Sequence, residues 1–147
     1  MMAEIKRKGQ AIWSGDKRGS GTVSTESEVL DGTRYTFKTR FGDQPGTNPE
    51  ELIAAAHAGC FSMALAATAS DKGYTPLYIK TEATCTLVPL DGGGYKIAKM
   101  DLDVSAKVLD IDEETFQELV EAADQGCPVS NLLRSGLEIT LNASLAE

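Results

Sequence analysis

The sequence has little material for metal or histidine chemistry. It contains one histidine, His57, in 147 residues, which argues against a multi-histidine metal site and an ordinary histidine-based triad. His57 lies in an alanine-rich segment, where a hydrogen-bonded packing role is favoured over catalysis. Three cysteines, an odd number placed far apart, do not make a disulfide scaffold.

Positive charge is also scarce. There are 22 Asp and Glu against 14 Lys and Arg, so the formal net charge is −8. Because phosphate binding needs a basic face, this composition argues against a nucleic-acid surface and against attachment to anionic lipid. Residues 1–8 lack the apolar stretch of a signal peptide. We therefore expect a cytoplasmic protein whose thiols stay reduced, with no nucleic-acid or membrane partner.

One long stretch carries no charged side chain. Between Glu51 and Asp71 there is no Asp, Glu, Lys or Arg, which is close to the length of a membrane span. The stretch is mostly alanine, with few Leu, Ile or Phe, so it gains little in lipid. We interpret it as a helix that is buried in protein on most of its circumference.

Local signals define the ends of this helix. Asn48 can cap it, Pro49 suits the first helical position, and Glu51 can complete a capping box. The pattern continues to Lys72, and Gly73 is a natural stop. Such a helix is about 35 Å long, and so small a domain has little left to cover it. A partner chain is the simplest source of that cover.

The other predicted elements are short strands and a second long helix. Strands are expected over 5–13, 22–27, 35–41 and 137–141, a hairpin over 77–88 and 95–108, and helices from Asp112 and near Pro128. This order predicts an α+β fold rather than a parallel α/β fold. No linker or repeat divides the chain, so we expect a single domain over residues 1–147.

The three cysteines differ in their surroundings. Cys85 lies on the packed face of a predicted strand and is interpreted as a small buried hydrophobe. Cys60 lies in the middle of the long helix, where it fits a core position, although its small neighbours would also let a substrate approach. Cys127 precedes Pro128 at the start of a short helix, where free N–H groups and the helix dipole lower the pKa of a thiol. Position alone makes Cys127 a candidate reactive thiol.

Two sequence blocks resemble the signatures of the OsmC/Ohr family. The first is GTNPEEL at 46–52 followed by AHAGCFSMA at 56–64, and the second is GCPVS at 126–130. Both occur in order and with the family's cysteine spacing. The segments GQAIW at 9–13 and GTVSTE at 21–26 are more similar to the OsmC branch than to the Ohr branch.

The resemblance implies a thiol peroxidase that reduces organic hydroperoxides, and hydrogen peroxide less well, without a metal or organic cofactor. It implies an intertwined homodimer, with two long central helices flanked by antiparallel sheets and sites at the interface. Cys60 matches the peroxidatic cysteine and Cys127 the resolving one, whose disulfide an external dithiol reduces. Glu50 matches the glutamate that orients a catalytic arginine. Arg40 matches that arginine in the OsmC branch, and Arg18 lies near the Ohr-branch position and remains the alternative.

Helix geometry adds an independent constraint on such a site. Glu50 and Cys60 are ten residues apart, which is about 15 Å along one helix axis. They cannot touch within a straight helix. If both serve one site, Glu50 comes from the partner chain or acts through an intermediary.

Other functions remain open at this point. A redox sensor or a small-molecule-binding module would use the same thiol pair without turnover. The acidic helix within residues 110–124 could dock a basic partner, although a solvated face is the commoner explanation. Phe61 and Met63 could line a site for an alkyl hydroperoxide or could pack in the core.

Overall fold

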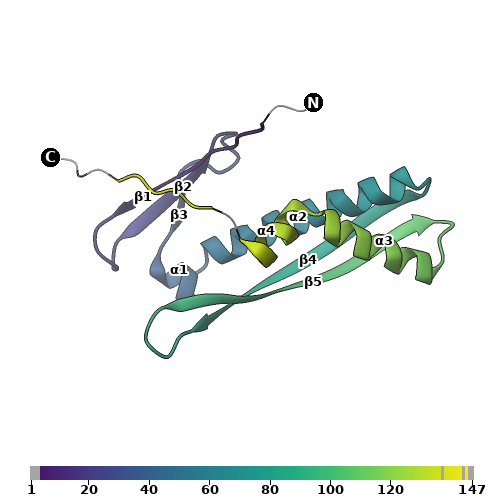
Figure 1. The fold of residues 1–147 in the computed structure, drawn as a ribbon. Helices are drawn as coiled ribbons and strands as arrows, with labels where there is room; N and C mark the ends of the chain where they lie inside the picture. The colour runs from purple at the N-terminus through teal and green to yellow at the C-terminus, as the bar shows by residue number, and fades with distance from the viewer. Residues whose placement is uncertain (1–3, 137, 144, 146–147) are drawn as a thin grey trace. The chain divides into compact units, whose positions relative to one another are not determined.

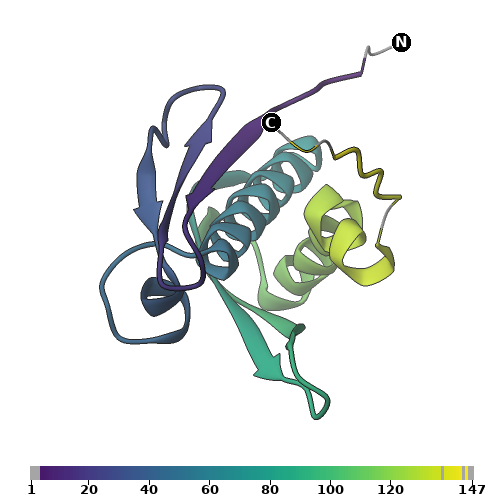
Figure 2. The ribbon, with the colours of Figure 1, turned by 90° about the vertical axis from the view of Figure 1, so that its left-hand side faces the viewer.

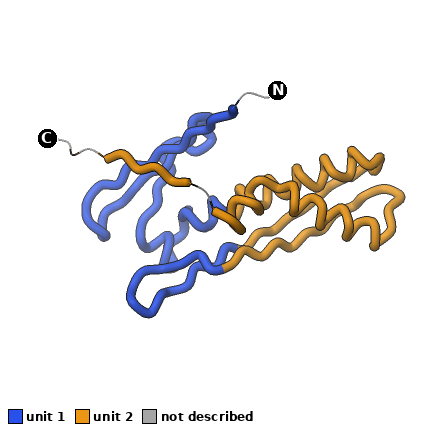
Figure 3. The backbone as a smooth tube through the Cα atoms, viewed as in Figure 1, with its two compact units in different colours: residues 1–53, 85–98 blue, residues 54–84, 99–147 orange. Residues whose placement is uncertain are grey.

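The computed structural model describes residues 4–136, 138–143 and 145. Two compact units divide the chain: unit 1 holds residues 1–53 and 85–98, and unit 2 holds residues 54–84 and 99–147 (Figure 3). Helix α2 (Pro49–Asp71) and strands β4 (Thr75–Pro89) and β5 (Tyr95–Leu109) each contribute residues to both units. The α+β class is confirmed, with antiparallel strand pairing. The single domain over residues 1–147 stays a prediction.

A three-stranded antiparallel sheet opens unit 1 (Figure 1). β1 (Gly9–Ser14) pairs with β2 (Ser20–Thr25), which pairs with β3 (Thr33–Tyr35). The register places Gly21 between Trp13 and Tyr35. A Cβ atom at Gly21 would lie 2.6 Å from a ring atom of each neighbour. Glycine therefore lets the two rings meet edge to face, with centroids 5.5 Å apart.

The prediction of a strand over residues 35–41 is wrong. β3 ends at Tyr35, and helix α1 spans Phe37–Phe41. The Thr36 hydroxyl accepts a hydrogen bond from the Thr39 N–H at 3.1 Å, and the Thr39 hydroxyl accepts one from the Thr36 N–H at 2.9 Å. This reciprocal cap fixes a helix start, and it overrides the strand preference of the aromatic and β-branched residues here.

Helix α2 begins and ends where its signals predict. The Asn48 side chain accepts a hydrogen bond from the Glu51 N–H at 2.8 Å. The Glu51 carboxylate does not complete the predicted capping box; it accepts from the Thr47 hydroxyl at 2.9 Å. The helix ends at Asp71, and Gly73 follows with a φ of 88°, a conformation that favours glycine.

The described residues of the chain leave one face of α2 uncovered. By length and composition alone the helix could cross a membrane, yet only 22% of its most apolar 18-residue window is buried. The burial that the sequence predicts for this helix is thus not supplied by the part of the chain that the structure describes. A stripe of exposed residues runs along the helix and comprises Ala55, Gly59, Met63 and Ala67, of which Met63 is 75% exposed.

In unit 2, α2 and α3 (Glu113–Gly126) lie side by side on one face of the β4–β5 hairpin (Figures 1 and 2). The buried core consists of Phe61, Leu65 and Ala69 from α2, Leu119 and Ala123 from α3, and Cys127. Helix α4 (Pro128–Ser135) follows immediately after Cys127. The apolar residues of α3, which are Phe116, Leu119, Val120 and Ala123, therefore lie on the face that packs into this core.

The hairpin is confirmed, but the last predicted strand is not. The Leu90 N–H donates to the Gly94 carbonyl at 2.9 Å and closes the turn between β4 and β5. Leu137 lies outside the described residues, and residues 138–141 have no regular secondary structure. Ile139 and Leu141 are 81% and 91% exposed, because no described strand pairs with this segment.

Leu119 tests the core of unit 2. Its side chain is 1% exposed. Leu119→Ala should lower the free energy of unfolding by about 2–5 kcal/mol, because buried apolar contacts are lost and a cavity remains. Val29→Ala, at a residue that is 82% exposed, is the control and should change it by less than about 0.5 kcal/mol. Urea denaturation at one fixed protein concentration measures both, and equal small effects would contradict this core.

Candidate functional site

Two of the three cysteines meet in unit 2. Cys60 lies in the middle of α2, and Cys127 caps the start of α4. Their sulfur atoms are 3.4 Å apart. Cys127 is fully buried and Cys60 is half-buried. Since a disulfide bond is about 2.05 Å long, a small movement would join the two sulfurs.

The two thiols differ in acidity. Burial raises the pKa of Cys60; the Val129 N–H opposes this, and the neighbouring Cys127 raises it further. Burial also acts against ionisation of Cys127, but the backbone N–H and hydroxyl of Ser130, the Cys60 thiol and the Val129 N–H together lower its pKa. This agrees with the effect expected at a helix start. None of the groups that act on Cys60 is a cation.

A buried polar cluster adjoins Cys127. His57 is 5% exposed, and its Nε2 atom lies 2.8 Å from the Ser130 hydroxyl oxygen. Asp124 of α3 accepts a hydrogen bond from Arg134 of α4 at 2.5 Å. A cavity of about 440 Å³ is lined by His57, Asp124 and Arg134, by Gln117 and Glu121 of α3, and by apolar side chains. His57 thus occupies the hydrogen-bonded position that the sequence favours, and sequence reasoning missed its partner Ser130.

In unit 1 the structure brings Arg40 and Glu50 together. The Arg40 Nε donates to both carboxylate oxygens of Glu50, at 3.0 and 3.1 Å, and Nη2 donates to Oε1 at 2.5 Å. Glu50 lies in the first turn of α2, where the helix dipole favours a carboxylate. Burial acts to raise the pKa of Glu50, but hydrogen bonds and the charge of Arg40 lower it overall. The side chain of Glu50 is 10% exposed and that of Arg40 is 33% exposed, so the guanidinium is fixed yet accessible.

Short contacts hold α1, and with it Arg40, in place within unit 1. The Thr39 hydroxyl donates to the Thr47 carbonyl at 2.8 Å and ties α1 to the loop before α2. The Arg40 guanidinium carbon lies 4.9 Å from the centre of the Phe41 ring, a cation–π arrangement. Phe41 stacks on Tyr95 with centroids 4.7 Å apart. The guanidinium is therefore supported on one side by a carboxylate and on another by an aromatic face.

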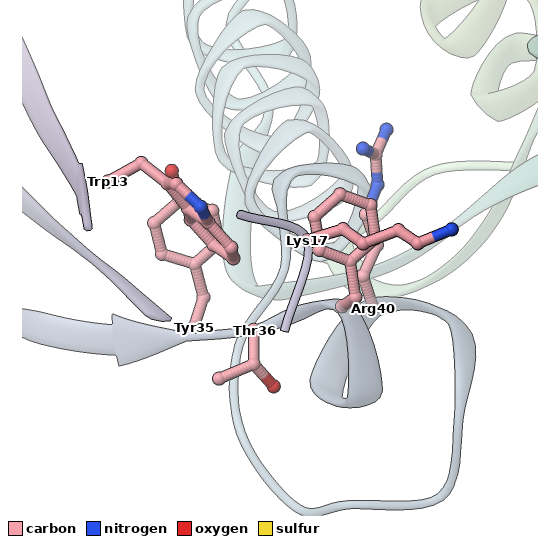
Figure 4. Close-up of a pocket in the computed structure, with 6 residues that line it drawn as sticks. Trp13, Lys17, Tyr35, Thr36 and Arg40 are labelled. Carbon is pink, nitrogen blue, oxygen red and sulfur yellow. The ribbon is translucent and has the colours of Figure 1, made fainter. Parts of the chain in front are cut away.

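An aromatic pocket lies beside Arg40 (Figure 4). It has a volume of about 380 Å³, and its lining consists of Trp13, Lys17, Tyr35, Thr36, Phe37 and Arg40. The rings of Trp13 and Tyr35 form one side and Arg40 the other. Sequence reasoning missed this pocket. Its signal was the pairing of Trp13 and Tyr35 across Gly21, which becomes visible only with the strand register.

The alternative arginine lies in a different setting. Arg18 is in the turn between β1 and β2 and pairs with Asp16 at 3.1 Å. Its side chain is 87% exposed. The structure does not bring Arg18 into contact with Glu50, whose carboxylate is bound by Arg40.

The remaining candidates are placed as follows. Cys85 lies on β4 in unit 1 and is half-buried, and burial and the charge of Glu50 raise its pKa. Phe61 is 2% exposed and packs in the core, whereas Met63 belongs to the exposed stripe of α2. Among the described residues, no group of three or more His, Cys, Asp or Glu side chains is placed to hold a metal ion.

Glu50→Gln tests the ion pair through its pH dependence. Because the pKa of Glu50 is lowered in the folded chain, its charge contributes stability above the ordinary glutamate pKa of about 4.3. That contribution is lost as the pH falls through the lowered folded-state value. Between pH 7 and pH 3, the free energy of unfolding should therefore fall more for the wild-type chain than for Glu50→Gln. Urea denaturation at each pH measures this free energy. Glu118→Gln, at an exposed residue of α3, is the control and should lose as much stability as the wild-type chain over this pH range. If Glu50→Gln also loses as much stability as the wild-type chain, the assignment of the ion pair is contradicted.

Comparisons with known proteins identify the family. Peroxiredoxin OsmC of Escherichia coli (strain K12) is 51% identical over 142 residues, which cover 96% of this chain and 97% of that relative. The organic hydroperoxide resistance protein OhrB of Bacillus subtilis is 34% identical over 83% of this chain and 88% of its own. The crystal structure of an organic hydroperoxide resistance protein from Elizabethkingia anophelis matches with a TM-score of 0.71 and 25% identity, over 94% of each chain. The family model described as OsmC-like protein matches residues 42–142. With two signature blocks, a matching fold and half of its residues shared with an OsmC protein, this chain belongs to the OsmC/Ohr family.

Proposed function

We propose that this chain is a thiol peroxidase that reduces organic hydroperoxides to alcohols, and hydrogen peroxide more slowly, in defence against oxidative and osmotic stress. The observation that carries the proposal is the pair of sulfur atoms of Cys60 and Cys127, 3.4 Å apart in a member of this family. Relatives named peroxiredoxin and organic hydroperoxide resistance protein support the same activity. The protein acts in the cytoplasm, where free thiols persist.

In the proposed reaction, the Cys60 thiolate attacks the terminal oxygen of the hydroperoxide and the O–O bond breaks. The alkoxide leaves and takes a proton to become an alcohol, and Cys60 becomes a sulfenic acid. The Cys127 thiolate then attacks the Cys60 sulfur, and hydroxide leaves and takes a proton to become water. An external dithiol reduces the resulting disulfide by two electrons and is itself oxidised to a disulfide. No metal or organic cofactor takes part.

Cys60 needs a cation that its own surroundings do not supply. Burial raises the pKa of its thiol, and among the described residues the group that opposes this is the Val129 N–H, which is not a cation. A guanidinium beside Cys60 would stabilise both the thiolate and the leaving alkoxide. Arg40 suits this role because the hydrogen bonds that it donates to the Glu50 carboxylate fix its plane while a third of its side chain stays exposed. We assign Arg40 rather than Arg18 to the site.

The geometry of α2 supports a site made by two chains. Glu50 and Cys60 both lie on this helix, about 15 Å apart along its axis, so one helix cannot bring them into contact. Its exposed stripe of small residues and Met63 offers a face to a second copy. In the proposed intertwined homodimer, two α2 helices lie at the centre with antiparallel sheets outside. Each site uses the two thiols of one chain and the Arg40–Glu50 pair of the other.

The aromatic pocket supports an organic substrate. Trp13, Tyr35 and Phe37 offer apolar surface next to Arg40. An alkyl or aryl group can bury its surface there, and hydrogen peroxide has no such group to bury. The preference for organic hydroperoxides follows from this difference.

A second candidate function is a redox sensor or binding module that uses the same thiol pair without turnover. The 3.4 Å contact between Cys60 and Cys127 suits a switch as well as a catalyst. Assays with an alkyl hydroperoxide and excess dithiol separate the two functions. A peroxidase consumes hydroperoxide continuously, whereas a sensor is oxidised once and stops.

Single cysteine variants test the two thiol roles. Cys60→Ser should abolish even one round of peroxide reduction, because it removes the attacking sulfur. Cys127→Ser should consume about one equivalent of peroxide per chain and then stall or over-oxidise as sulfenic acid. Cys85→Ser is the control and should leave turnover largely intact, because the sulfur of Cys85, on β4, takes part in neither thiol step. A sulfenic-acid trap with mass spectrometry reads each variant. Sulfenate trapped on Cys127 in Cys60→Ser, with none on Cys60 in Cys127→Ser, would reverse the roles.

Paired heterodimers test whether each site draws on two chains. Light scattering should give twice the chain mass of 15.7 kDa. A heterodimer of one Arg40→Ala chain and one Cys60→Ser chain, purified with two different tags, should keep about half of the wild-type activity, because one of its two sites is intact.

The reciprocal heterodimer provides the control. When both substitutions are in one chain and the partner is wild type, neither shared site is complete, so activity should be strongly reduced. The opposite result, with the first heterodimer inactive and the second half-active, would place each site within a single chain.

A further inference from the structure

The polar cluster beside Cys127 has a feature that the proposed reaction does not yet use. His57 and Ser130 come from α2 and α4 and are 5% and 2% exposed. Their side chains meet at 2.8 Å, between His57 Nε2 and the Ser130 oxygen. Ser130 is the third residue of α4 after the cap Cys127, so its N–H and hydroxyl lie toward the cap side chain. A buried histidine thus reaches the surroundings of a buried thiol through one serine.

The position of the proton on His57 follows from its surroundings. Burial lowers the pKa of His57. The negative charge of Asp124 acts to raise this pKa, and the positive charge of Arg134 acts to lower it further. The ring is therefore neutral at pH 7 and carries one proton. His57 Nδ1 is buried, and no described residue forms a hydrogen bond with it. A proton on Nδ1 would leave a buried donor unpaired, which is unfavourable. The proton therefore resides on Nε2, which donates to the Ser130 oxygen.

This hydrogen bond leaves the Ser130 hydroxyl proton to another acceptor. The two neighbouring acceptors are the Asp124 carboxylate and the Cys127 sulfur. Asp124 accepts from Arg134 at 2.5 Å, and its carboxylate also accepts from the Ser130 hydroxyl while Cys127 is a neutral thiol. The neutral Cys127 side chain makes no hydrogen bond to the first turn of α4, but a negative charge on its sulfur would be stabilised by the N–H and the hydroxyl of Ser130, which act to lower its pKa. The thiolate is thus the form that gains from the serine.

We propose that His57 and Ser130 are positioning residues for the resolving step, in which His57 holds the Ser130 hydroxyl with its proton toward the Cys127 sulfur. This rests on the proposed function, which assigns Cys127 as the resolving thiol. Cys127 then attacks the Cys60 sulfenic acid as a thiolate: the S–S bond forms, the S–O bond of Cys60 breaks, and hydroxide leaves and takes a proton from solvent. His57 gives up no proton in this step.

The charged and titratable groups around this cluster come from three helices. They are His57 and Cys60 from α2, Glu121 and Asp124 from α3, and Arg134 from α4. Strand β5 contributes apolar side chains to the adjoining cavity. Asp124 and Arg134 pair with each other, so the Ser130 hydroxyl and the α4 N–H groups are the donors left for Cys127.

A thiol titration tests this contact without any peroxide. In a Cys60→Ser, Cys85→Ser background Cys127 is the remaining thiol, and thiolate absorbance in the ultraviolet follows its ionisation. Ser130→Ala should raise the pKa of Cys127 by about one pH unit, a tenfold loss of thiolate below both values.

Variants of His57 locate the source of the effect. His57→Leu should raise the pKa of Cys127 in the same direction as Ser130→Ala, because the serine hydroxyl loses its fixed orientation. His57→Gln keeps an N–H donor and should restore most of the wild-type value. Ser62→Ala is the matched control, since it removes another hydroxyl of the same unit, bonded to Thr81 at 2.7 Å, and should leave the value unchanged.

Kinetics of the full chain then separate positioning from packing. Timed trapping of the sulfenic acid gives the rates of Cys60 oxidation and of disulfide formation separately. Below the pKa of Cys127, Ser130→Ala should slow disulfide formation about threefold. The variant has about tenfold less Cys127 thiolate, but each thiolate is about threefold more nucleophilic because its pKa is higher. Above both pKa values the variant should match or exceed wild type. Cys60 oxidation should stay within about twofold throughout. A packing role would slow both steps and would not produce this reversal with pH.

The outcomes distinguish this inference from the proposed function. An unchanged pKa of Cys127 in a folded Ser130→Ala chain, checked by circular dichroism, overturns the inference and leaves the peroxidase proposal standing. If no sulfenic acid forms on Cys60 even in wild type, the peroxidase proposal fails, and the titration still decides whether Ser130 acts on Cys127. If His57→Leu fails to fold, the pKa of Cys127 in Ser130→Ala and in His57→Gln decides whether the inference holds.

Discussion

An α-helix advances about 1.5 Å per residue, and α2 carries Glu50 in its first turn and Cys60 ten residues later. The helix therefore holds the carboxylate and the thiol about 15 Å apart, whatever the rest of the chain does. Each group finds a partner in its own unit, since Arg40 binds Glu50 and Cys127 contacts Cys60. Cys60 is half-buried and the pKa of its thiol is raised, and a nearby cation would lower that pKa. In the proposed homodimer, Arg40 of the second copy would supply that cation.

The two thiols depend on different sources of stabilisation. Cys127 lies at the start of α4, where Ser130 and Val129 lower the pKa of its thiol although it is fully buried. This stabilisation is intrinsic to the folded chain. Cys60 lies in mid-helix, where its neighbours' N–H groups are engaged in the helix, and its pKa is raised. In the proposed dimer only Cys60 depends on assembly, so its reactivity would be coupled to dimer formation while that of Cys127 would not.

The sequence predicts those features that depend on local patterns. The caps of α2, the hairpin turn and the apolar face of α3 each follow from residues within a few positions of one another. The strand over residues 35–41 failed because two threonines cap a helix, and alternation of side chains does not reveal that. The pairing of Arg40 with Glu50 and of Cys60 with Cys127 was expected from family resemblance, not from pattern. The contact between His57 and Ser130, which are 73 positions apart, cannot be predicted from a local pattern. The same holds for the aromatic pocket, which also depends on tertiary contacts.

The place of Trp13 has a practical consequence. It is the one tryptophan in the sequence, and Gly21 lets its ring contact Tyr35 in the wall of the pocket beside Arg40. Indole emission from this protein therefore comes from a single ring at a single place. A molecule that enters the pocket changes the polarity around that ring, so the unlabelled protein carries its own optical reporter of occupancy. The same glycine that allows close packing of two aromatic rings thereby makes the pocket visible to fluorescence in solution.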